Sequence, residues 1–214
     1  MGAASGLVGV IIALIGLSAG GVGSTSRFAR PSLNATADQI VAYMQQPAST
    51  VWPLSLGLAF TSFVFLLVFF VRLWATLRTA EGGSGWLSTA GLAGAVVYVV
   101  VDLSRFVVTD ARYMAVGHHF QAAGALVLFD LSNALTPLDW AAIAMFMLPA
   151  AVVAIRSRAL PPWLAWAGLA IGAANFVWAW LPPGGTGTPA EFAFIFWVVL
   201  TSVVLLQRPL PRKS

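Results

Sequence analysis

Long apolar stretches, separated by short polar ones, dominate the pattern of this chain. Stretches without any charged side chain cover residues 1–26, 39–71, 82–101, 140–155, 159–190 and 192–207. Several exceed the roughly 20 residues that a helix needs to cross about 30 Å of hydrocarbon. The pattern predicts membrane-spanning helices at about 7–23, 52–77, 86–108, 138–156, 162–181 and 189–207. Tryptophans near the predicted boundaries support these edges: Trp52, Trp86, Trp140, Trp163 and Trp180.

The composition agrees with a protein solvated by lipid. The chain is 59% hydrophobic and 8% charged, whereas soluble domains carry roughly 25% charged residues. Helices can span a bilayer because they satisfy their own backbone hydrogen bonds, which isolated strands cannot do. We therefore predict an all-α fold, a polytopic membrane helix bundle with about six transmembrane helices. It forms a single integral membrane domain over residues 1–214, and its first partner is the lipid bilayer.

Two further helices are expected outside the six spans, and the first precedes the second span. Thr36 and Gln39 form a capping-box pattern, which marks a helix N-terminus. The helix that they begin, Ala37–Gln46, ends before Pro47. Its apolar side predicts an amphipathic helix that lies on the outer membrane surface or over the mouth of the bundle.

The second of these helices is expected over Phe120–Leu135, a segment too apolar for a plain loop. Thr136–Pro137 is expected to end it. The pattern leaves open whether the segment is a re-entrant half-helix in the outer half of the bundle or an upper extension of the span at 138–156.

Basic residues beside the spans predict the orientation of the chain. Six spans place both termini on the same side, together with seven of the eleven basic residues. The excess of Lys and Arg on the cytoplasmic side of membrane proteins makes both termini cytoplasmic and indicates a plasma membrane protein. The isoelectric point near 10.4 is then a topology signal, and no nucleic-acid partner is expected.

The acidic residues are distributed less evenly than the basic ones. Glu81 belongs to the cytoplasmic side, and six acids belong to the outer half: Asp38, Asp102, Asp110, Asp130, Asp139 and Glu191. Acids contribute little to topology. Their distribution is compatible with an outward-facing polar cavity or with hydrated loop ends, and both interpretations stay open.

Asp102 and Arg105 are the most informative polar pair. They lie within the apolar run at 96–108, where a charged side chain is costly and usually faces a bundle interior or a wet cavity. Residues three apart share a helix face, so the two side chains can neutralise each other. One interpretation is a ligand or proton site. The other is a structural ion pair that fixes this helix against a neighbour.

Other polar residues complete the set of candidate ligand-binding positions. Asp130 and Asn133 form a second pair with i, i+3 spacing and are expected to face the interior. Adjacent histidines on a helix point about 100° apart, which makes them poor joint ligands for one metal ion. The full candidate set is Asp102, Arg105, His118, His119, Asp130, Asn133, Asn175 and Glu191.

The sequence contains no catalytic motif. It has no cysteine, which excludes disulfides, thiol catalysis and Cys-ligated metal sites. No HExxH spacing, phosphate-binding loop, dinucleotide fingerprint or nucleophile elbow is present. We therefore predict no metal site and no cofactor, and we assign no catalytic residue.

Two segments resemble a known family. They are Leu73–Val96 (LWATLRTAEGGSGWLSTAGLAGAV) and Ile155–Val177 (IRSRALPPWLAWAGLAIGAANFV). They are similar to the two cytoplasmic turns of an uncharacterised family of bacterial, mostly actinobacterial, multi-pass membrane proteins, catalogued as a domain of unknown function. Pro162 stands where this family often has a basic residue. The resemblance implies about six helices in a plasma membrane, and it implies no activity.

The leading functional hypothesis is a non-catalytic bundle that binds an apolar small molecule or associates with another membrane protein, including a homo-oligomer. The alternative is a membrane-embedded enzyme or small transporter that uses an outer-half polar cluster of Asp102, Arg105 and Asp130. Clustering of these side chains would favour the alternative, because polar groups inside a membrane bundle commonly mark ion pathways and proton relays.

Overall fold

The computed structural model describes residues 4–17, 31–45, 52–114, 121–181 and 189–207. These residues form helices and connecting turns, with no strand among them. The helices are α1 (Ala4–Leu17), α2 (Ala37–Met44), α3 (Trp52–Glu81), α4 (Trp86–Met114), α5 (Ala122–Ser157), α6 (Pro162–Trp178) and α7 (Pro189–Gln207). The predicted all-α fold is therefore confirmed for the described part of the chain.

Four of the described helices are long and apolar enough to cross a membrane, namely α3, α4, α5 and α7. The other two apolar helices are shorter, with 14 residues in α1 and 17 in α6. The helices thus support a membrane protein with at least four spanning segments, whereas six spans remain a prediction. At 36 residues and 1.5 Å per residue, α5 is about 54 Å long, so part of it extends beyond a 30 Å hydrocarbon layer unless it is strongly tilted.

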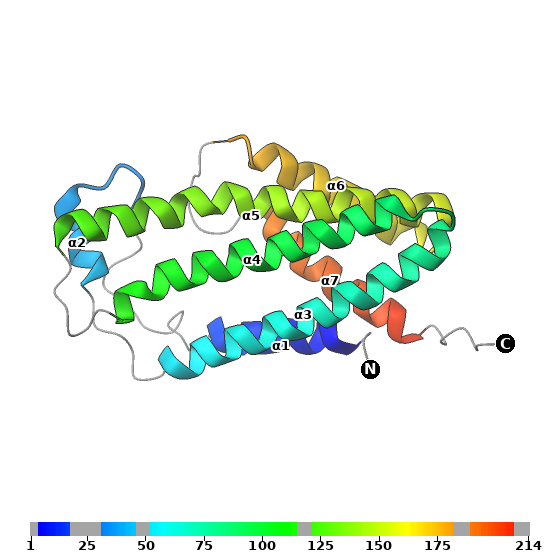
Figure 1. Ribbon diagram of the computed structural model, residues 1–214, viewed down its shortest axis with the longest axis horizontal. Helices are drawn as coiled ribbons and strands as arrows, with labels where there is room; N and C mark the ends of the chain where they lie inside the picture. The colour runs from blue at the N-terminus through cyan, green and yellow to red at the C-terminus, as the bar shows by residue number, and fades with distance from the viewer. Residues whose placement is uncertain (1–3, 18–30, 46–51, 115–120, 182–188, 208–214) are drawn as a thin grey trace.

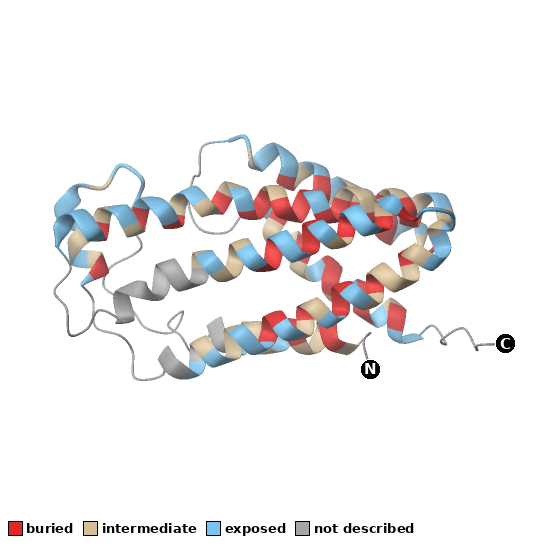
Figure 2. Ribbon diagram, viewed as in Figure 1, coloured by how far each residue is buried: buried red, intermediate tan, exposed pale blue. Residues whose placement is uncertain are grey.

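The helices form an elongated bundle in which α5 is the central element (Figure 1). α4 and α6 both pack along α5, while α1 packs on α3 and also touches α7. α4 and α5 approach each other closely at Gly94, where a Cβ would lie 2.5 Å from backbone atoms of Met145 and Phe146. Buried residues concentrate in the middle of the bundle and toward the turn between α3 and α4 (Figure 2).

The turn between α3 and α4 is fixed by Glu81. Its carboxylate accepts hydrogen bonds from the backbone N–H groups of Leu87 and Ser88 and from the Ser88 hydroxyl. These N–H groups belong to the first turn of α4, where a helix leaves its donors without partners. Gly82 and Gly83 adopt φ values of 67° and 51°, which suit glycine because it has no Cβ.

α2 lies against the N-terminal end of α5 (Figure 1). The predicted capping box is present: the Gln39 N–H donates to Thr36 Oγ1, and the Thr36 N–H donates to Gln39 Oε1. Ile40 and Met44 are buried against Phe129 of α5. The predicted amphipathic helix is therefore confirmed, although it ends at Met44, two residues before its predicted end.

α5 corrects the prediction that a helix ends at Thr136–Pro137. The helix runs through Pro137 without interruption, so the described part of Phe120–Leu135 is a continuation of the following span. Membrane helices tolerate an internal proline because neighbouring helices and side-chain hydroxyls can satisfy the backbone groups that it frees. Trp140 is consequently 1% exposed in the middle of α5, and its predicted place at a helix boundary was wrong.

Candidate functional site

The first part of the site is the pair of Asp102 and Arg105, whose side chains lie on one face of α4. Arg105 donates from Nε and Nη2 to Asp102 Oδ1, at 3.0 and 2.6 Å. The predicted contact within this pair is therefore present. Each side chain is less than one-fifth exposed, so the pair lies in a largely desolvated place, where an ion pair interacts more strongly than in water.

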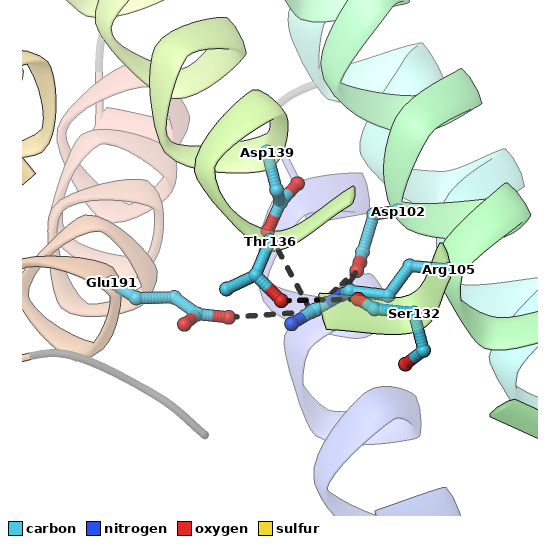
Figure 3. A network of polar contacts seen from close by, with 6 residues as sticks. All are labelled: Asp102, Arg105, Ser132, Thr136, Asp139 and Glu191. Carbon is cyan, nitrogen blue, oxygen red and sulfur yellow. Dashed lines mark hydrogen bonds and ion pairs between the residues drawn. The ribbon is translucent and has the colours of Figure 1, made fainter. Parts of the chain in front are cut away.

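Arg105 also reaches two acidic residues on other helices. Its Nη2 atom lies 3.6 Å from Asp139 Oδ2 on α5 and 3.5 Å from Glu191 Oε1 on α7. Figure 3 shows the guanidinium placed among the three carboxylates. We call Asp102, Arg105, Asp139 and Glu191 the charged cluster. It connects α4, α5 and α7 at a single point.

Local structure explains how two of the helices present these groups. On α5, Ser132, Thr136 and Asp139 follow helical spacing and form one polar face, and the Thr136 hydroxyl donates to the Ser132 carbonyl at 3.3 Å (Figure 3). On α7, Glu191 lies in the first turn. A carboxylate there is favoured by the positive end of the helix dipole.

The cluster holds more acidic groups than basic ones. Three carboxylates share one guanidinium, so the cluster carries a net charge of −2 when all its members are ionised. Asp139 is 0% exposed, and neither of its carboxylate oxygens accepts a hydrogen bond from a described residue. A buried carboxylate that lacks hydrogen bonds is strongly disfavoured in its charged form. Asp139 is thus the least satisfied member of the cluster.

An aromatic layer lies beside the cluster. Tyr98 is one turn before Asp102 on α4, and its ring meets Phe194 of α7 edge to face, with centroids 5.3 Å apart. Phe146 of α5 also contacts Phe194. Tyr98 shares the α4 face of Asp102, and Phe194 shares the α7 face of Glu191, each three or four residues away. The cluster therefore faces an apolar wall on one side, which keeps its dielectric constant low.

The structure brings together three of the predicted site residues, Asp102, Arg105 and Glu191. Asn175 lies in a different contact, where its Nδ2 donates to the carbonyls of Ile171 and Ala190. His118 and His119 lie outside the described residues. The ligand-binding role of the whole set stays a prediction.

The expectation that Asp130 and Asn133 face the interior together was wrong for Asp130. Asp130 is exposed, and Asn133 donates to the Phe129 carbonyl of its own helix. Asp130 precedes Asp139 by nine residues, or about 14 Å along α5. At that distance it lies beyond the charged cluster, toward the end of α5 that α2 covers (Figure 1).

Asp139 is the site residue that the sequence analysis did not select. The expectation of a helix end at Pro137 placed Asp139 at a membrane boundary, where a charge is unremarkable. An uninterrupted helix over 122–157 places the same carboxylate within an apolar span, where it counts as a functional candidate.

The described residues contain no group of three or more His, Cys, Asp or Glu side chains arranged to hold a metal ion. At the charged cluster the guanidinium of Arg105 already stands where the three carboxylates converge (Figure 3). The arrangement is therefore suited to charge compensation and to proton binding.

Comparisons of this chain with protein-family models, curated proteins and solved structures find no match. The resemblance of Leu73–Val96 and Ile155–Val177 to an uncharacterised bacterial family stays a prediction. A functional assignment must come from the site itself.

Proposed function

We propose that this protein is a membrane-embedded, proton-binding helix bundle and that Asp139 is its proton acceptor. The observation that carries the proposal is the excess of acid at a buried point: three carboxylates share one guanidinium, and Asp139 has no hydrogen-bond donor among the described residues. A protonated Asp139 would remove one negative charge and would also gain an O–H donor. The proposal corresponds to a small proton-coupled transporter more closely than to an enzyme.

A proton suits the charged cluster better than a larger cation. A metal or organic cation would have to displace the guanidinium of Arg105 from its contacts with Asp102, Asp139 and Glu191. A proton binds covalently to one carboxyl oxygen and leaves those contacts in place. Buried acidic residues inside membrane spans are typical of proton relays in pumps and transporters.

The depth of the cluster supports access for protons from one side. Asp102 is about 24 Å along α4 from Trp86, and Glu191 is about 24 Å along α7 from Gln207. Trp86 and Gln207 both lie toward the end of the bundle that carries the α3–α4 turn (Figure 1). If that end meets the cytoplasmic interface, the cluster lies near the opposite edge of a 30 Å hydrocarbon layer. This placement assumes the plasma membrane and cytoplasmic termini that the basic residues predict.

Infrared spectroscopy tests the proton acceptor directly. In lipid nanodiscs, the wild-type protein should show the carbonyl stretch of a protonated carboxyl group near neutral pH, because ionised Asp139 would be buried without hydrogen bonds. Asp139→Asn should remove this band. Asp130→Asn changes an exposed carboxyl group of the same helix and should leave it intact. A wild-type spectrum without the band, or a band unaffected by Asp139→Asn, would refute the proposal.

Cysteine labelling tests the orientation, since the native chain has no cysteine. Ser84→Cys places a thiol in the α3–α4 turn, and Ala37→Cys places one at the exposed start of α2. With an impermeant maleimide and intact cells, we expect Ala37→Cys to react and Ser84→Cys to react only after lysis. The reverse pattern would overturn the predicted cytoplasmic termini.

The hypothesis of a bundle that binds an apolar molecule or another membrane protein, including a second copy of the chain, stays a prediction beside this proposal. Large apolar side chains of α6 are exposed, including Trp163, Trp166 and Phe176. A lipid bilayer accounts for such a surface without a protein partner.

A further inference from the structure

Two polar side chains outside the charged cluster, Trp140 of α5 and Asn175 of α6, are buried where these two helices pack together. Trp140 follows Asp139 directly, and its ring packs edge to face on Trp178 of α6, with centroids 6.3 Å apart. Successive residues of a helix point about 100° apart. Asp139 can therefore face Arg105 of α4 while Trp140 faces α6.

Asn175 shares the α6 face of Trp178, three residues away, and Trp140 and Asn175 each have one atom with unused hydrogen-bonding capacity. The indole N–H of Trp140 has no acceptor among the described residues, and Asn175 Oδ1 has no donor among them. Trp140 is 1% exposed and Asn175 is 0% exposed. Buried polar atoms are nearly always hydrogen-bonded, to the protein or to an ordered molecule. The Trp140 indole N–H lacks an acceptor and Asn175 Oδ1 lacks a donor, so a single group that both accepts and donates would satisfy them.

The orientation of the Asn175 amide is determined by its neighbours. Its Nδ2 group donates to Ile171 O at 3.0 Å and to Ala190 O at 3.3 Å. A flipped amide would direct its oxygen at these two carbonyl oxygens, which cannot donate. Nδ2 thus uses both of its protons, and Oδ1 remains an acceptor. The contact with Ala190, next to Glu191, also places Asn175 beside the first turn of α7.

We propose that Trp140 and Asn175 bind one hydroxyl group, which accepts from the indole N–H and donates to Asn175 Oδ1. A hydroxyl group is the smallest chemical group that provides one donor and one acceptor together. It can belong to a buried water molecule or to an alcohol group of a lipid. This site is separate from the charged cluster, and its existence does not depend on proton binding at Asp139.

Nuclear magnetic resonance of the tryptophan side chains tests this site. The protein is labelled with 15N at the indole positions and placed in nanodiscs of deuterated phosphatidylcholine, and Trp140→Phe assigns the Trp140 signal. We expect a cross-peak from the Trp140 indole proton to water. Trp197 is the matched control, because its buried indole N–H already donates to Leu164 O at 2.9 Å. Its signal should show no such cross-peak.

A second lipid distinguishes the two sources of the hydroxyl group. Replacing phosphatidylcholine with protonated phosphatidylglycerol adds lipid hydroxyl groups, and a new cross-peak to the glycerol protons would identify lipid as the source. In Asn175→Val the Trp140 signal should lose its cross-peak and shift upfield. The proposal is overturned if the wild-type Trp140 indole proton shows cross-peaks only to protons of the chain itself. This outcome is read from the wild-type protein, so it does not depend on whether Asn175→Val folds.

Discussion

Gly94→Ala should destabilise the protein strongly, although it adds a single methyl group. A Cβ at position 94 would lie 2.5 Å from the carbonyl carbon of Met145 and from the backbone nitrogen of Phe146. These are backbone atoms of α5, so the two helices must move apart before the methyl group fits. Overpacking of a core costs roughly 1–3 kcal/mol and sometimes more. We expect the free energy of unfolding to fall by at least that amount in thermal or denaturant unfolding in detergent.

Gly57→Ala is the matched control for this prediction. Gly57 is also a helical glycine, in α3, but a Cβ built there meets no atom within 4 Å. Alanine in a helix interior is favoured over glycine by roughly 0.5–1 kcal/mol. Gly57→Ala should therefore leave stability unchanged or raise it slightly. If both variants unfold at the same temperature, α4 and α5 are not in backbone contact at Gly94.

Hydrophobic pattern alone is sufficient to predict most of the helices. The uncharged tracts predicted the ends of α3, α4, α6 and α7 to within three residues, except for the C-terminal ends of α3 and α4. Those two helices continue for four and six residues beyond their predicted ends. Local signals were also sufficient for α2, because its capping box involves only neighbouring residues.

Pro137 is the point at which local reasoning failed. Proline usually ends or kinks a helix, because it has no N–H donor and its ring clashes with the preceding turn. Inside a membrane bundle the loss is offset by neighbouring helices, and such compensation is a tertiary property that a local pattern does not contain. The error separated Asp139 from its span, so the most buried acid among the described residues was taken for a boundary residue.

The charged cluster could be predicted only in part for a related reason. Spacing along α4 was enough to place Asp102 beside Arg105. The contact of Arg105 with Glu191 joins residues 86 positions apart, and it depends on how α7 packs against the other helices. Spacing also could not place Asp130, because a shared helix face does not determine the depth of a residue along the helix.

Arg105→Gln should be the most damaging substitution in the charged cluster. Among the described residues it removes the cation that contacts Asp102, Asp139 and Glu191, and glutamine carries no positive charge to replace it. Removal of one partner from a buried ion pair costs about 3–5 kcal/mol. We expect a loss of this size near neutral pH in thermal unfolding. Lowering the pH should restore part of it, because protonated carboxyl groups need no cation.

Two further variants separate charge compensation from simple loss of packing. Arg105→Gln combined with Asp102→Asn should be more stable than Arg105→Gln alone, because one uncompensated carboxylate is removed together with its cation. Arg156→Gln is the control for a lost arginine at an exposed position of α5, and it should change stability by less than about 1 kcal/mol. Equal unfolding temperatures for the single and double variants at neutral pH would mean that Asp102 and Arg105 are not energetically coupled.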